Sequence, residues 1–221
     1  MNPIIFLDID GVLNSWDWWA RRKNEPPPEE LMGVVDLDPL ACQRLQRICA
    51  QTGAQLVISS TWRMHHTTPG LQELFARRGL VAPIIGRTPC LDRQGYEFEE
   101  PWNRIGRGLE IQWWLQNFLP SDEAVCDQRF AIIDDDGDMG DLRGKLVQTR
   151  MATGLTDLEG DYVFKHLSEP LMHSMAAGGK GRVLFKYNVR DLEPWWNRQT
   201  GPFGPEGWKK TNVPTAPVST N

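Results

Sequence analysis

The most informative part of this sequence lies near its start and reads Ile4-Ile5-Phe6-Leu7-Asp8-Ile9-Asp10-Gly11-Val12-Leu13-Asn14. Its first four residues are apolar without polar alternation, which is typical of a parallel strand that helices cover on both faces. Asp8 and Asp10 are two positions apart, so an extended strand places both carboxylates on one side. Like charges this close repel unless a cation or a proton neutralises one of them. The run therefore predicts a buried strand that ends in two acids, with a turn at Gly11.

Helices and strands are expected to alternate along the first three quarters of the chain. A helix that starts after the N-cap Asp38 and stops at Gly53 leads into a strand over 54–58. The same kinds of signal predict helices over 69–78, over 104–119 and after Thr156, and strands over 81–85, 129–133 and 145–149. This alternation predicts an α/β fold with three layers and a mainly parallel sheet.

Polar residues follow the predicted strands at their carboxyl ends. Ser59 comes directly after the second strand, and Asp134 comes after a later one. In a parallel sheet these ends lie at one edge, where ligands bind in folds of this class. We therefore expect Asp8, Asp10, Ser59 and Asp134 to form one polar site.

These segments resemble the motifs of the haloacid dehalogenase (HAD) superfamily of phosphoryl-transfer enzymes. Asp8-Ile9-Asp10-Gly11-Val12 is similar to the first motif, and Ser59-Ser60-Thr61-Trp62-Arg63 is similar to the second. The third motif is a lysine or arginine at a helix start, for which Arg107 is the first choice and Arg104 the alternative. Asp134-Asp135-Asp136 is similar to the fourth. The resemblance implies a Rossmann-like HAD fold with a minimal cap insertion.

The resemblance also implies a set of catalytic roles. Asp8 would attack phosphorus and form an aspartyl phosphate, which divides one displacement into two easier ones. Asp10 would protonate the leaving oxygen and later accept a proton from water. Ser59, with Ser60 as the next candidate, would hold a phosphoryl oxygen, and Arg107 would neutralise charge on the transferring group.

The acids of the first and fourth motifs imply a Mg²⁺ site. Mg²⁺ prefers oxygen ligands and keeps several of its waters. By the resemblance, its ligands would be the carboxylates of Asp8 and Asp134 and the backbone carbonyl of Asp10. Asp135 or Asp138 would hold its waters.

A closer resemblance covers residues 3–168 and relates the chain to small HAD domains associated with bacterial and phage RNA repair. It implies a phosphatase that acts on RNA or DNA ends. Trp62 and Arg63, beside the second motif, are candidates for substrate binding, because aromatic rings stack on bases and arginines hold phosphates. The interleaved tryptophans and basic residues of 16–23 suggest the same use. Packing under the cap insertion is the alternative for the tryptophans.

Two other functions are compatible with the sequence. A small-molecule phosphomonoesterase, such as a nucleotidase, would use the same motifs. A catalytically idle module could instead bind a nucleic acid or protein through a carboxyl-terminal segment rich in tryptophan, although both acids of the first motif are present.

Composition sets the outer limits of these predictions. With 221 residues, 40% of them hydrophobic and 24% charged, we expect one globular domain over 1–169, a small flap or cap over 14–37, and a partly irregular extension over 170–221. The net charge is −5, but residues 176–221 hold 7 basic and only 3 acidic side chains. No apolar run approaches the roughly 20 residues of a membrane helix, and no signal peptide is expected. These features predict a cytoplasmic protein.

Overall fold

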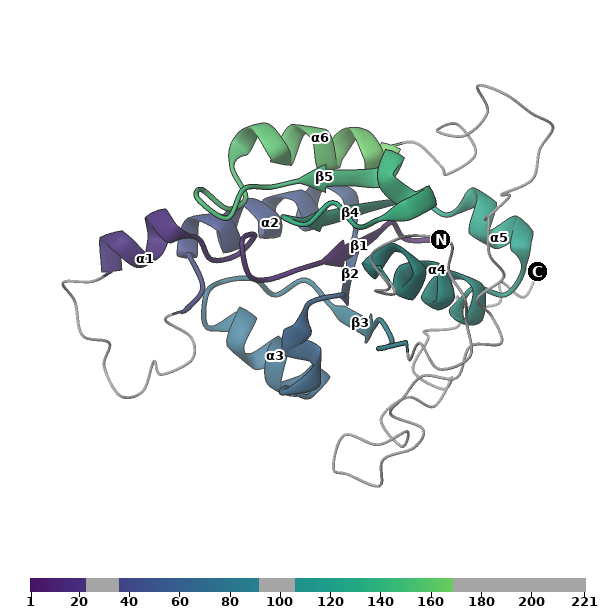
Figure 1. Ribbon diagram of the computed structural model, residues 1–221, viewed down its shortest axis with the longest axis horizontal. Coiled ribbons are helices and arrows are strands. Elements are labelled where there is room, and N and C mark those ends of the chain that lie inside the picture. The colour runs from purple at the N-terminus through teal and green to yellow at the C-terminus, as the bar shows by residue number, and fades with distance from the viewer. Residues whose placement is uncertain (23–35, 92–105, 169–221) are drawn as a thin grey trace, which may run out of the picture.

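The computed structural model describes residues 1–22, 36–91 and 106–168 and has an α/β, Rossmann-like architecture (Figure 1). Five strands form one sheet in the order β3-β2-β1-β4-β5, and every pair is parallel. In chain order the strands are β1 (Ile4–Leu7), β2 (Gln55–Ile58), β3 (Ile84–Arg87), β4 (Phe130–Asp134) and β5 (Leu146–Gln148). The predicted fold class is confirmed.

The register of the central strands aligns their carboxyl ends. Leu7, the last residue of β1, pairs with Ile58 on β2 and with Ile133 on β4. The next residue along β1 is Asp8, and the corresponding residues on the neighbours are Ser59 and Asp134. The three polar residues therefore stand level at one edge of the sheet.

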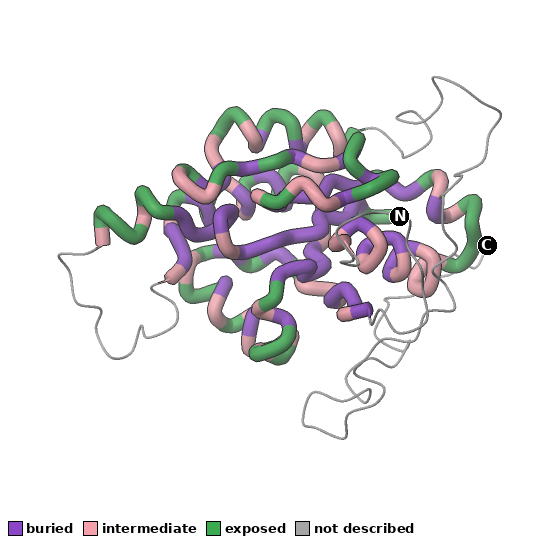
Figure 2. The backbone as a smooth tube through the Cα atoms, in the orientation of Figure 1, coloured by how far each residue is buried: buried purple, intermediate pink, exposed green. Residues whose placement is uncertain are grey.

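Helices cover both faces of the sheet. Along β1, Ile5 and Leu7 belong to one core cluster, whereas Ile4 and Phe6 belong to the other, as the two-residue period of a strand requires. On the first face pack α2 (Pro39–Thr52), α3 (Thr68–Ala76) and α6 (Asp157–Ser168); on the second pack α4 (Arg107–Phe118) and α5 (Asp122–Asp127). Figure 2 shows the strands buried between these layers.

Most predicted elements are present, with shifted ends. The helix after Thr156 starts with a capping box, since the Thr156 amide donates to Oε2 of Glu159 at 3.0 Å. The strand predicted over 81–85 is wrong in position, because β3 begins only at Ile84. The amides of Val81 and Ala82 donate to the Gln46 side chain instead of to the sheet.

Four short helical elements of the described chain were not predicted, one of which is the 3₁₀ helix η3 (Thr61–Met64). The other three are α5, the 3₁₀ helix η4 (Gly140–Lys145) and α1 (Trp16–Arg22), which lies within the predicted flap and buries none of its residues. Residues 23–35 of that flap, Arg104 and the predicted extension over 170–221 lie outside the described residues. None of the described helices has the length and apolarity needed to cross a membrane.

Candidate active site

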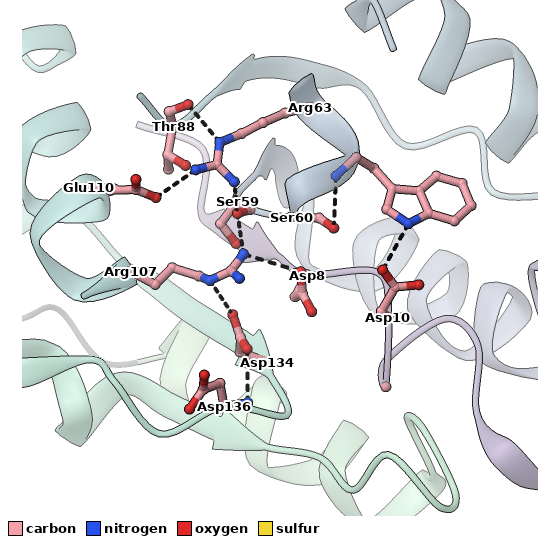
Figure 3. A network of polar contacts seen from close by, with 12 residues as sticks. Asp8, Asp10, Ser59, Ser60, Arg63, Thr88, Arg107, Glu110, Asp134 and Asp136 are labelled. Carbon is pink, nitrogen blue, oxygen red and sulfur yellow. Dashed lines mark hydrogen bonds and ion pairs between the residues drawn. The ribbon is translucent and has the colours of Figure 1, made fainter. Parts of the chain in front are cut away.

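The polar edge of the sheet brings three of the predicted site residues together (Figure 3). Asp8, Ser59 and Asp134 each follow or end a central strand, and all three are buried, with Asp8 only 5% exposed. The Oγ atom of Ser59 is buried without a hydrogen-bond partner in the described part of the chain. A buried cluster of this kind needs a neutralising charge.

Arg107 supplies one positive charge to this cluster. Its Nη1 atom donates to Oδ1 of Asp8 at 3.2 Å and to the carbonyl of Ser59, and its Nε atom lies 3.1 Å from Oδ2 of Asp134. Burial lowers the pKa of Arg107, but Asp134 and Asp8 raise it further, so the pKa is above its usual value and the guanidinium stays charged. The structure therefore places Arg107 between the first and fourth motifs.

The position of Arg107 depends on a close approach between α4 and the loop before η4. Arg107 is the first residue of α4, and its amide donates to Oδ2 of Asp138 at 3.0 Å. The next amide, of Gly108, donates to the Asp138 carbonyl at 3.2 Å. A Cβ atom on Gly108 would lie 2.1 Å from the Met139 carbonyl oxygen, so only glycine fits. Asp138 thus holds the start of α4 in place.

Asp8, Asp134 and Asp135 form a candidate metal centre. Each offers one carboxylate oxygen, and these oxygens all lie within 4.8 Å of one another. Gly11, at φ +72°, leaves room for Asp135, because a Cβ there would lie 2.6 Å from the Asp135 carboxyl carbon. Oδ2 of Asp134 is buried and accepts no hydrogen bond from a described residue, although Arg107 is near it. An all-oxygen set with an unsatisfied buried oxygen fits a hard divalent cation such as Mg²⁺.

The electrostatics of these carboxylates also favour a cation. Burial raises the pKa of Asp134 from 3.8 to about 7, against the opposing charge of Arg107. Burial likewise raises the pKa of Asp8, although Arg107 and a hydrogen bond from Ser60 oppose the rise. The pKa of Asp135 is raised mainly by burial as well. One guanidinium is therefore too little positive charge to keep all three carboxylates ionised as they would be in water.

The carboxylate of Asp10 lies apart from this group. Its Oδ1 atom accepts a hydrogen bond from Nδ2 of Asn14 at 2.7 Å, and its Oδ2 atom accepts one from Nε1 of Trp62 at 2.9 Å. Figure 3 shows Asp10 to one side of the group formed by Asp8, Arg107 and Asp134. Both carboxylate oxygens of Asp10 thus have protein partners, whereas the resemblance assigns its metal contact to the backbone carbonyl.

Comparison with known families agrees with this geometry. A family model described as the HAD domain in Swiss Army Knife RNA repair proteins matches residues 4–159. The chain belongs to this HAD family. The match runs from β1 into α6 and includes every strand end described above. The predicted resemblance to the HAD domains of RNA repair is therefore confirmed. Neither the curated proteins nor the solved structures include a significant match to the chain.

In this HAD domain Arg63, predicted to bind substrate, is instead buried in the protein. Its guanidinium donates to the carbonyls of Ser59, Thr88 and Pro89 and to Oε2 of Glu110, at 2.6 Å. Glu110 is itself buried, and burial raises its pKa despite the opposing charge of Arg63. Arg63 therefore ties the loop of the second motif to the Thr88 and Pro89 carbonyls and to Glu110, and the structure does not bring it to the acid cluster.

Ser60 and Trp62, which were also predicted to bind substrate, lie next to the two acids of the first motif. Ser60 caps the 3₁₀ helix η3 (Thr61–Met64), since its Oγ atom accepts from the Trp62 amide at 3.4 Å. Trp62 is half-buried, and its indole N–H donates a hydrogen bond to the carboxylate of Asp10. Sequence reasoning missed the supporting side chains of Asn14 and Glu110. Asn14 follows Asp10 by four positions across a glycine turn, which is the one local signal that could have indicated it.

Proposed function

We propose that this HAD domain is a Mg²⁺-dependent phosphatase that acts through an aspartyl phosphate on Asp8. The observation that carries the proposal is the convergence of three carboxylates around one arginine, Arg107: those of the buried Asp8 and Asp134 and of the half-buried Asp135. Membership of the HAD family supports hydrolase chemistry at this site.

The residues of the candidate centre fit a Mg²⁺ ion. Asp8, Asp134 and Asp135 would hold it through carboxylate oxygens, and Asp10 through its backbone carbonyl. The ion would supply positive charge that stabilises the phosphoryl oxygens. It would also offset the negative charge of the carboxylates that Arg107 alone does not balance.

The chain's own residues then carry out two displacements. An Asp8 oxygen attacks phosphorus while the bond from phosphorus to the leaving oxygen breaks, and Asp10 gives that oxygen its proton. In the second step Asp10 takes a proton from a water molecule, whose oxygen attacks the same phosphorus. The bond to Asp8 breaks, inorganic phosphate leaves, and Asp8 and Asp10 return to their starting states. Arg107 neutralises charge on the phosphoryl oxygens in both steps.

The substrate class that we propose is a phosphate at a nucleic-acid end, in RNA repair. The family description supports this class. A second support is α1, which follows the first motif and also carries Arg21 and Arg22. Two of its tryptophans are exposed, Trp16 at 68% and Trp19 at 49%. Indole rings next to basic side chains suit stacked bases and phosphates.

The test is phosphate release from a 3′-phosphorylated RNA oligonucleotide, from the matching mononucleotide and from 4-nitrophenyl phosphate. Each is assayed with Mg²⁺ and with a chelator, for wild type and Asp8→Asn. We expect release that needs Mg²⁺ and falls by about 10³-fold or more in Asp8→Asn, because the nucleophile is lost. A higher kcat/KM for the oligonucleotide than for the mononucleotide supports the nucleic-acid end. The reverse order would instead indicate a nucleotidase, and activity that survives in Asp8→Asn contradicts the mechanism.

A further inference from the structure

The two side chains that hold Asp10 both donate hydrogen bonds to it. Nε1 of Trp62 is 2.9 Å from Oδ2, and Nδ2 of Asn14 is 2.7 Å from Oδ1. The orientation of the Asn14 amide is fixed, because its Oδ1 atom accepts from the Gly11 amide at 2.9 Å. A backbone amide can only donate, so the NH₂ group of Asn14 must face Asp10.

The indole ring of Trp62 is held in place from several sides. It stacks on the ring of His66, with centroids 5.4 Å apart and planes inclined by 27°. The backbone carbonyl of His66 accepts from Nη1 of the buried Arg87 at 3.0 Å. The ring of Trp62 also packs against the core cluster that contains Leu71 and Phe75. Its N–H is therefore aimed at Asp10 by a fixed support.

This arrangement restricts where a proton on Asp10 can point. The indole N–H and the amide NH₂ are donors without acceptor capacity, so neither can receive a hydrogen bond from a protonated Asp10 carboxyl. Each donor occupies one lone-pair direction of its carboxyl oxygen. A proton on Asp10 must lie along a remaining direction, away from Trp62 and Asn14.

We infer that Trp62 is a positioning residue that holds the Asp10 carboxyl in the orientation from which it protonates the leaving oxygen. The inference rests on the proposed phosphatase function, and it assigns Trp62 a role different from stacking on a substrate base. In this role Trp62 acts through Asp10 and does not touch the reacting atoms.

The discriminating variant is Trp62→Phe, which keeps an aromatic ring against His66 and removes only the N–H donor and part of the ring. It is compared with wild type on phenyl phosphate and 4-nitrophenyl phosphate, two esters of similar size. The phenolate of the first is the more basic leaving group and needs the acid more. We expect kcat/KM to fall about 10-fold or more on phenyl phosphate and less than about 3-fold on 4-nitrophenyl phosphate. Trp113→Phe, on α4, makes the same chemical change at a tryptophan that does not hold Asp10 and is expected to match wild type.

A double-mutant cycle with Asp10→Asn separates this role from a structural one. If Trp62 acts through Asp10, then Trp62→Phe causes no further loss of kcat/KM in the Asp10→Asn background. Equal losses on both esters, a loss that persists in the Asp10→Asn background, or no loss at all would overturn the inference while leaving the phosphatase intact. A wild type that hydrolyses neither ester nor phosphorylated RNA would overturn the proposed function, and the inference with it.

A measurement without turnover tests the contact itself. In ¹⁵N-labelled protein, the indole N–H resonance that disappears in Trp62→Phe belongs to Trp62. We expect it to lie downfield in wild type and to move upfield in Asp10→Ala, whereas the resonance that Trp113→Phe removes, which belongs to Trp113, stays in place. A Trp62 resonance that does not respond to Asp10→Ala would show that the hydrogen bond is absent in solution and would overturn the inference.

Discussion

At the scale of single residues, the acid cluster combines burial with incomplete neutralisation. Asp134 is fully buried, and its pKa is raised to about 7 mainly by burial, although Arg107 lies beside it. Asp8 and Asp135 have raised pKa values for the same first reason. Without a metal ion, the folded site is therefore most stable when some of these carboxyl groups are protonated.

This electrostatic state predicts a pH dependence of stability without metal. Between the unfolded pKa of Asp134, near 3.8, and the folded pKa of about 7, the folded state binds more protons than the unfolded state. The contribution of Asp134 to the unfolding free energy should thus be highest below about pH 4 and should fall as the pH rises toward 7. The fall is on the order of 3 kcal/mol. Urea denaturation from pH 4 to 8 in chelator measures it.

The matched variants are Asp134→Asn and Asp161→Asn, the second on an exposed position of α6. We expect Asp134→Asn to flatten the pH dependence and Asp161→Asn to leave it unchanged. If the slope is the same in wild type and Asp134→Asn, burial of Asp134 does not control the stability of the metal-free protein.

At the scale of elements, the site depends on how closely α4 approaches the loop that follows β4. The amides of Arg107 and Gly108 both bond to Asp138, and Gly108 leaves no room for a side chain against the Met139 carbonyl. The start of α4 is thereby fixed relative to the strand that carries Asp134. Arg107 reaches two strand ends because its helix begins at that point.

Gly108→Ala is therefore expected to lower activity, although Gly108 contributes no side chain to the site. The added methyl group would force α4 and the loop apart, which costs about 1–3 kcal/mol of unfolding free energy and moves Arg107 away from Asp8. We also expect phosphatase kcat/KM to fall by about 10-fold or more. Gly144→Ala in η4 is the control, since a Cβ there meets no atom within 4 Å. Chemical denaturation and kinetics on both variants decide the matter; equal behaviour of the two variants would contradict the close-approach argument.

At the scale of the whole molecule, the parallel sheet assembles one site from segments that are far apart in the chain. The register that pairs Leu7 with Ile58 and Ile133 puts Asp8, Ser59 and Asp134 side by side. A cation bound there would link β1 to β4 and would bind the folded state only. Its binding should stabilise the entire fold.

Mg²⁺ is accordingly expected to raise the unfolding free energy in a saturable way. At a free concentration ten times the dissociation constant, the gain is about 1.4 kcal/mol. Asp134→Asn should lose most of this gain, whereas Asp161→Asn should keep it. Thermal and urea unfolding at increasing Mg²⁺ measure the effect at pH 8, which is above the raised pKa of Asp134. Equal stabilisation of both variants would place the binding of Mg²⁺ elsewhere.

Local patterns in the sequence were sufficient for the class of fold and for the first-motif acids. The apolar run before Asp8, the cap at Asp38 and the capping box at Thr156 each involve residues only a few positions apart, so they can be read without the fold. The strand predicted over 81–85 failed because Gln46, on another element, binds its first amides. The helix α1 was missed because it buries no residue and therefore shows no apolar period.

What the sequence by itself determined is the alternation of strands and helices and the identity of the polar residues at the strand ends, because periodicity and capping depend on near neighbours. Only the tertiary structure decided how those residues are used. It buries Arg63 against Glu110, which is 47 positions away in the chain. It also brings Arg107 into contact with Asp8, 99 positions away, and Trp62 into contact with Asp10, 52 positions away. Such contacts follow from strand register and helix packing, which no local pattern encodes.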